Sequence, residues 1–170
     1  MKKIYLAGPD VFRPNALEFF DSLKEVVKSY GYIPLPPLDN SIDFKEGEFH
    51  TQQGADKIFK ANIDLINKAD VIIANLISFR GVCIDDGTAF EIGYGFAMGK
   101  VIYGYTEDYL IPLNEKTEKY FVNNPSGNFS VVENFGYCSN LMICSSIKSS
   151  GGKILKNIEE CLDDLIIQNK

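Results

Sequence analysis

The stretch Asp70-Val71-Ile72-Ile73-Ala74-Asn75-Leu76 decides the fold. It is an apolar, β-branched run, which is typical of a central parallel strand that is buried on both faces. Residues 55–69 before it have the apolar spacing of a helix, and residues 88–98 after it predict a second helix that ends at Gly99. A strand between two helices indicates a βαβ unit.

The same alternation continues in both directions along the chain. Residues 3–7 predict a short buried strand that breaks at Gly8-Pro9. The remaining expected elements are a helix at 15–30, a strand at 101–105, a loop with helical pieces at 110–129, a partly helical segment at 133–146 and a closing helix at 152–168. These elements predict right-handed crossovers and a parallel sheet covered by helices on both faces.

In such a sheet the ligand lies outside the carboxyl ends of the strands. Three segments leave those ends in this chain, namely residues 7–12, residues 75–91 and the loop after Leu35. We therefore expect any chemistry to be found in these segments.

Composition narrows the choice of partners. The chain has 170 residues, which suits one domain spanning residues 1–170. Its 23 acidic residues outnumber the 17 basic ones and give a formal net charge of −6. A nucleic-acid polymer is excluded as a partner because phosphate neutralisation needs a basic face, whereas free nucleosides remain open.

Neither a metal site nor a membrane anchor is expected. The four cysteines form no C-x-x-C pair, and the one histidine, His50, is too few for the usual zinc sites. The apolar stretch near the N-terminus is too short for a signal peptide. The longest apolar run, residues 71–77, cannot span a bilayer. These observations predict a soluble, cytoplasmic protein.

The block Asp85-Asp86-Gly87-Thr88-Ala89-Phe90-Glu91-Ile92-Gly93 is the segment richest in chemistry. Thr88 and Glu91 have the spacing of a capping box, in which Glu91 would only satisfy a backbone amide. The alternative is a carboxylate in the first turn of a helix at the carboxyl edge of the sheet. There the positive end of the helix would keep Glu91 ionised, as a carboxylate nucleophile requires.

Other mechanisms lack their residues. A serine or cysteine nucleophile would need His50, which lies in a polar loop without an obvious partner. The chain has no phosphate-binding P-loop, and no G-x-G-x-x-G follows the first strand. The glycines at 93 and 95 lie inside a helical pattern, where close packing explains them.

Four segments together resemble the nucleoside 2-deoxyribosyltransferase family. They are Ile4-Tyr5-Leu6-Ala7-Gly8-Pro9, residues 62–76, the block at 85–93 and Asn140-Leu141-Met142-Ile143. Ser78-Phe79-Arg80-Gly81 and Asn134-Phe135-Gly136 are most similar to the trypanosomal-type branch. The resemblance implies a flavodoxin-like, three-layer α/β/α fold with a parallel sheet of about five strands, and exchange of the base on a 2'-deoxynucleoside.

The resemblance also implies roles for individual residues. Glu91 matches the nucleophile that attacks C1' of the deoxyribose, and Asp85 matches the aspartate that holds the sugar hydroxyls. Tyr5 matches a tyrosine near the nucleophile, although a buried strand residue would look the same. Gly8 and Phe12 fall in the loop that lines the base pocket, where Phe12 could equally be an apolar anchor.

Two further positions concern the leaving base and the assembly. Asn140 matches an asparagine that reaches the sugar in the site of a neighbouring subunit, although it could simply cap a helix. Asn62 stands where many members have an aspartate that helps to protonate the leaving base. Asn62 can donate a hydrogen bond but no proton, and Asp64 lies about 200° further round the helix.

The expected activity is transfer of 2-deoxyribose between nucleobases without metal or other cofactor. The partners would be a 2'-deoxynucleoside, a free nucleobase and a second copy of the chain. One alternative is hydrolysis of a deoxynucleoside or of its 5'-monophosphate. The monophosphate would need a cluster of residues that binds the 5'-phosphate, and the segment after the first strand offers only Arg13. A second alternative is a cytokinin-activating phosphoribohydrolase, but this chain lacks the glycine-rich run that such enzymes have before the threonine. A non-enzymatic flavodoxin-like module that binds a nucleotide or flavin would need neither Glu91 nor Asp85.

Overall fold

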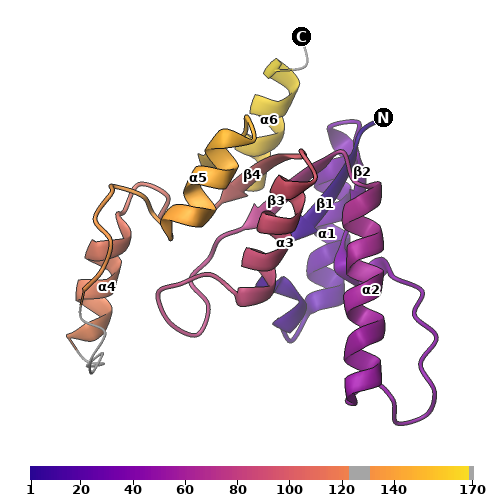
Figure 1. The fold of residues 1–170 in the computed structure, drawn as a ribbon. Coiled ribbons are helices and arrows are strands. Elements are labelled where there is room, and N and C mark those ends of the chain that lie inside the picture. Colours follow the sequence, from indigo (N-terminus) through magenta and orange to yellow (C-terminus); the bar gives the residue numbers. More distant parts are fainter. Residues whose placement is uncertain (123–130, 169–170) are drawn as a thin grey trace.

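The computed structural model describes residues 1–122 and 131–168 (Figure 1). Its elements, in chain order, are β1 (Lys3–Ala7), η1 (Pro9–Phe12), α1 (Ala16–Ser29), β2 (Ile33–Leu35), η2 (Pro37–Asp39), α2 (Gln52–Lys68), β3 (Val71–Asn75), α3 (Asp86–Ala97), β4 (Val101–Tyr105), α4 (Leu113–Phe121), α5 (Leu141–Ser149), β5 (Ile154–Leu155) and α6 (Ile158–Gln168). The end of the loop expected at 110–129 lies outside the described residues.

The sheet has five parallel strands in the order β2-β1-β3-β4-β5. This is the strand order of flavodoxin-like folds. The predicted central strand is β3, which pairs with β1 and β4 and is buried at all five positions. The expected fold, a flavodoxin-like α/β/α arrangement with about five parallel strands, is confirmed.

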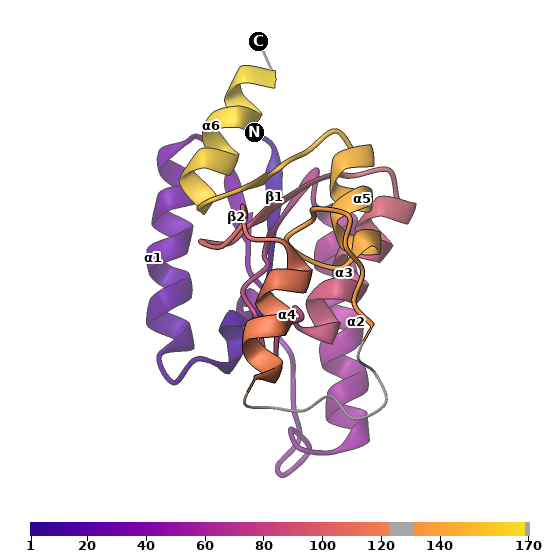
Figure 2. The same cartoon turned by 90° about the vertical axis from the view of Figure 1, so that its left-hand side faces the viewer.

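Helices cover both faces of the sheet (Figure 2). One face packs against α1 and α6, and its core includes Leu6, Ile73, Val27 and Leu162. The other face packs against α2, α3 and α5, and its core includes Tyr5, Ile72, Ile66, Ile92 and Ile147. Successive strand residues alternate between the two cores because side chains of a strand point to opposite faces.

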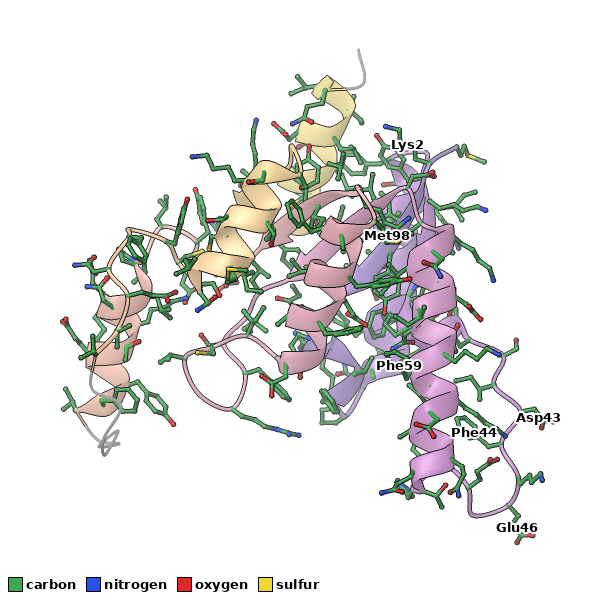
Figure 3. All side chains as sticks on the ribbon, viewed as in Figure 1. Lys2, Asp43, Phe44, Glu46, Phe59 and Met98 are labelled. Carbon is green, nitrogen blue, oxygen red and sulfur yellow. The ribbon has the colours of Figure 1, made fainter. Side chains whose placement is uncertain are left out.

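The apolar spacing at 15–30 predicts one buried face that includes Leu17, and the spacing at 55–69 predicts one that includes Phe59, but both buried faces are narrower. Phe20, Leu23 and Val27 of α1 are buried, whereas Leu17 is 72% exposed. In α2, Ile66 is buried but Phe59 is exposed and contacts Phe90 of α3 instead of the sheet. Figure 3 labels Phe59 on the side of α2 that faces α3.

The closing helix is shorter than predicted. It begins at Ile158, and residues 154–155 form β5, which pairs with Gly104 and Tyr105 of β4. The physical reason lies at Gly152, where a Cβ atom would overlap the carbonyl group of Ile102. The backbone passes so close to β4 there that it continues as an edge strand before turning into a helix.

One segment stands away from these layers. Figure 1 shows α4 apart from the sheet and its helices, joined to them through the residues before α5. Leu113 and Thr117 are buried, while Leu110, Phe135 and Met142 expose large apolar side chains.

No helix within residues 1–122 and 131–168 is long and apolar enough to cross a membrane.

Candidate active site

A hydrogen bond joins Tyr5 and Glu91, although 86 residues separate them in the chain. The phenol of Tyr5 donates to Oε1 of Glu91 over 2.5 Å. Tyr5 belongs to β1 and is fully buried, and Glu91 belongs to α3, which packs across β1, β3 and β4. The fold therefore brings two of the predicted site residues into direct contact.

Burial dominates the electrostatics of this pair. Loss of solvent raises the pKa of Glu91 to about 7, the hydrogen bond from Tyr5 opposes the rise, and the charge of Asp85 adds to it. Burial and the charge of Glu91 raise the pKa of Tyr5 far above neutrality, so that the phenol remains a donor. Near pH 7 the acid and the carboxylate forms of Glu91 are comparably populated.

This differs from the expectation that the end of the helix keeps Glu91 ionised. The helix begins at Asp86, with Asp85 as its N-cap, so Glu91 lies in the second turn. The dipole effect is confined to the first turn. Burial of the carboxylate therefore outweighs the positive end of the helix.

The predicted capping box is also wrong. Oδ2 of Asp85 accepts hydrogen bonds from the backbone N–H of Thr88 at 2.9 Å and from its hydroxyl at 3.1 Å. Asp85 thus accepts from the backbone N–H of Thr88, which the Glu91 carboxylate would have accepted from in a capping box. Glu91 is free for Tyr5, and Oδ1 of Asp85 has no hydrogen-bond partner among the described residues.

A cavity of about 430 Å³ lies beside Asp85. Its walls are residues 79–85 of the loop between β3 and α3, Asp86 at the start of α3, and Tyr120 and Phe121 of α4. Tyr5 and Glu91 do not line it. The cavity therefore reaches Asp85, whose charge acts on Glu91, and it is large enough for part of a small ligand.

Gly8 is required by close packing at the end of β1. A Cβ atom there would lie 2.9 Å from Cβ of Asn75 and 3.0 Å from Oδ2 of Asp10, and the φ of Gly8 is 156°. Nδ2 of Asn75 donates to Asp10 over 2.9 Å, and Asp10 also accepts from Nε of Arg13. This buried network joins the loops after β1 and β3.

Phe12 contributes to the same junction. It is 58% exposed, so it is not a buried anchor, and it stacks on Phe79 with ring centroids 5.2 Å apart. The guanidinium of Arg80 lies over both rings, at 5.4 Å from Phe12 and 4.6 Å from Phe79. The loops after β1 and β3 therefore carry a stacked aromatic pair, exposed at Phe12 and half-buried at Phe79, with a cation over it.

The comparison with protein families shows to which family this chain belongs. The profile of the Nucleoside 2-deoxyribosyltransferase family matches residues 4–142. The chain belongs to this family.

The chain is also similar to solved structures and to a curated protein. The 2-desoxiribosyltransferase of Leishmania mexicana is 33% identical, with a TM-score of 0.74 over 98% of this chain and 97% of that one. An uncharacterized protein of Schizosaccharomyces pombe is 35% identical over 88% of this chain and 78% of its own length. The 2-deoxyribosyltransferase of Bacillus psychrosaccharolyticus shares the fold at 22% identity, with a TM-score of 0.58 over 96% of this chain and 89% of that one.

In this member of the deoxyribosyltransferase family, Asn62 lies on α2, one helical turn before the buried Ile66. Its Oδ1 accepts a hydrogen bond from Nδ2 of Asn40 at 3.1 Å. Asp64 is exposed, as its position on the helix predicts. No hydrogen bond links Asn62 to Tyr5 or Glu91 within the described residues.

Asn140 is the N-cap of α5 within its own chain. Its Oδ1 accepts from the backbone N–H of Met142 at 2.9 Å, and its Nδ2 donates to Glu133 at 3.2 Å. The side chain is exposed, and α5 packs beside α3. The capping role is confirmed, and it places Asn140 at the surface, where a second copy could be reached.

Sequence reasoning missed Asp10, Asn75 and Asn40. Two of them had a visible signal: Asp10 follows Gly8-Pro9 directly, and Asn75 is a polar residue at the end of a β-branched strand. Asn40 lies in a polar loop and gave no such signal. Within residues 1–122 and 131–168 there is no group of three His, Cys, Asp or Glu residues that could hold a metal ion.

Proposed function

We propose that this protein transfers 2-deoxyribose between nucleobases through a covalent glycosyl–Glu91 intermediate. The observation that carries the proposal is the half-buried Glu91 carboxylate, held by the Tyr5 phenol at 2.5 Å, with Asp85 at the start of the same helix. Membership of the deoxyribosyltransferase family supports the same chemistry.

In the first step, the ionised Glu91 attacks C1' of a 2'-deoxynucleoside. Tyr5 holds Oε1, so Oε2 is the oxygen that forms the bond to C1'. The bond between C1' and the base nitrogen breaks, and the base leaves with the electron pair and takes up a proton from water. The transition state resembles an oxocarbenium ion, as in retaining glycosidases.

In the second step, a nitrogen of an incoming base attacks C1' and releases the Glu91 carboxylate. The new base loses a proton, and the configuration at C1' is retained because it has been inverted twice. If water replaces the base, the product is free deoxyribose and the reaction is hydrolysis.

Asp85 and the aromatic edge would orient the substrate. Oδ2 of Asp85 is occupied by Thr88, which leaves Oδ1 to accept a hydrogen bond from a sugar hydroxyl. Gly8 keeps the backbone after β1 close to Asn75, and Phe12 offers its ring to the base. We place Asn62 beside the base as a hydrogen-bond donor.

The active species in this proposal is at least a dimer, with Asn140 of one chain completing the site of the next. The exposed Phe135 and Met142, at 65% and 70%, flank Asn140 in the chain and suit a partner surface.

Mixing inactive Glu91→Ala chains with Asn140→Ser chains tests the idea, since serine can still cap α5. Shared sites predict that activity returns. If chains exchange without recovery of activity, or if a monomer is fully active, the idea is wrong.

The activity itself is tested by incubation with deoxyinosine and free adenine, followed by chromatography. Formation of deoxyadenosine and hypoxanthine is expected, while hypoxanthine with free deoxyribose would indicate hydrolysis. Glu91→Ala should abolish either reaction without unfolding the protein, and Glu118→Ala on the exposed face of α4 is the control. A Glu91→Ala variant that exchanges bases at the wild-type rate would remove Glu91 from its role.

A further inference from the structure

Asn40 and Asn62 form a directed pair of side-chain amides. Asn40 follows η2 directly, and its Nδ2 donates to the carbonyl oxygen of Pro37 at 2.8 Å and to Oδ1 of Asn62 at 3.1 Å. Both contacts lie in half-buried surroundings, where a hydrogen bond is shielded from competing water.

The two contacts determine which way each amide points. The Pro37 carbonyl can only accept, so the atom of Asn40 that faces it must be the NH₂ group. The second hydrogen of that group points to Asn62, and the atom of Asn62 that receives it must therefore be its oxygen. This leaves the NH₂ group of Asn62, for which the described residues provide no acceptor.

The loop that carries Asn40 is held against α2. Lys57 of α2 donates to the carbonyl oxygen of Asp43 at 2.8 Å, pairs with Glu48 at 2.7 Å and lies near the ring of Phe44. Figure 3 shows Asp43 and Phe44 on the loop beside this helix. The contacts of Lys57 therefore fix the loop that carries Asn40 against α2.

The pair also lies near the candidate site. Asn62 is one turn before Ile66, and Ile66 belongs to the same core cluster as Tyr5. The short helix η2 contacts both β1, which carries Tyr5, and α2. The pair therefore lies where η2 and α2 pack against β1, the strand that carries Tyr5.

We propose that Asn40 is a positioning residue that fixes the amide of Asn62 as a hydrogen-bond donor to the leaving base. The inference rests on the proposed function and adds a substrate requirement to it. The base must carry an acceptor, which is N3 or N7 in a purine and O2 in a pyrimidine. An N–H donor stabilises the negative charge that develops on this atom as the bond to C1' breaks, without transferring a proton.

A double-mutant cycle with purine analogues tests the inference. The rates kcat/KM for deoxyadenosine, its 3-deaza analogue and its 7-deaza analogue are measured for wild type, Asn40→Ala, Asn62→Ala and the double variant. Asn62→Ala removes the donor and should lower kcat/KM for deoxyadenosine by about tenfold. For the one analogue that lacks the contacted nitrogen, the same substitution should change the rate by less than about twofold.

Asn40→Ala should act only through Asn62. It should lower kcat for deoxyadenosine several-fold with little change in KM, and it should add nothing in the Asn62→Ala background. A structural role would instead give independent, multiplying losses and equal losses for all three substrates, and this result would overturn the inference. Asn40→Ser, which retains a hydroxyl donor, should restore part of the rate.

Controls separate this inference from the proposed function. Asn67→Ala removes another side-chain contact of α2, to Tyr94, and should leave the ratio between the substrates unchanged. Thermal unfolding identifies a variant that fails to fold, in which case Asn40→Ser carries the test. An active wild type with independent effects at the two positions overturns only the inference. A wild type that cleaves no nucleoside overturns the proposed function, and the inference with it.

Discussion

Replacing Glu91 by glutamine should stabilise the protein in alkaline solution while abolishing deoxyribosyl transfer. Glutamine has nearly the same shape, and its oxygen can still accept from Tyr5, but it cannot ionise. In wild type, burial raises the pKa of Glu91 from 4.5 to about 7. The folded protein therefore binds this proton more tightly than the unfolded chain does, and stability is lost as the pH rises from about 4.5 to about 7.

The size of the effect follows from the two pKa values. A difference of about 2.5 units corresponds to roughly 3 kcal/mol of unfolding free energy at pH 8.5. At pH 5 most of Glu91 is protonated in the folded protein, and the loss is below about 1 kcal/mol. The advantage of Glu91→Gln over wild type should thus grow by about 2–3 kcal/mol between the two pH values.

Urea denaturation of wild type and Glu91→Gln at pH 5 and pH 8.5 measures this difference, with Glu118→Gln as an exposed control. In parallel, kcat/KM of the wild type should rise through pH 7 as Glu91 ionises. An equal stability difference at both pH values would show that Glu91 is not a buried acid, and the explanation of its pKa would be wrong.

Three other variants probe the neighbours of Glu91. Tyr5→Phe removes the hydrogen bond that lowers the pKa of Glu91, so the midpoint of the profile of kcat/KM against pH should move to higher pH; an unmoved midpoint contradicts the pairing. Asn62→Asp should preserve or raise the rate and add a falling limb to that profile, because it supplies a titrating acid; an unchanged profile would exclude position 62 from leaving-group activation. Gly8→Ala should lower the melting temperature measurably, because its methyl group would lie 2.9 Å from Cβ of Asn75; an unchanged melting temperature would contradict that packing.

The fold was predictable because its centre is encoded locally. The β-branched run at 70–76 predicts the central strand, and the helices on each side predict parallel pairing. The two-residue strand β5 was missed because its pairing with β4 depends on residues about 50 positions earlier in the chain. The close approach of Gly152 to Ile102 produces that pairing, and no local pattern encodes it.

The site was predictable in its residues more than in its local geometry. The capping box assigned to Thr88 and Glu91 competes with an equally valid signal, Asp85 as the N-cap with Thr88 three residues later. The structure follows the second signal, and Glu91 moves into the second turn. The family resemblance places Tyr5 near Glu91, but no local sequence pattern encodes their contact, because it depends on how α3 crosses β1.

The covalent intermediate is the central claim, and mass spectrometry tests it most directly. The protein is mixed with a 2'-deoxynucleoside in the absence of an acceptor base, quenched in acid and digested. The account predicts a peptide that contains Glu91 and is heavier by one 2-deoxyribosyl group, which disappears when adenine is added before the quench and is absent from Glu91→Gln. Turnover without any such adduct, or an adduct on a different residue, would contradict the account.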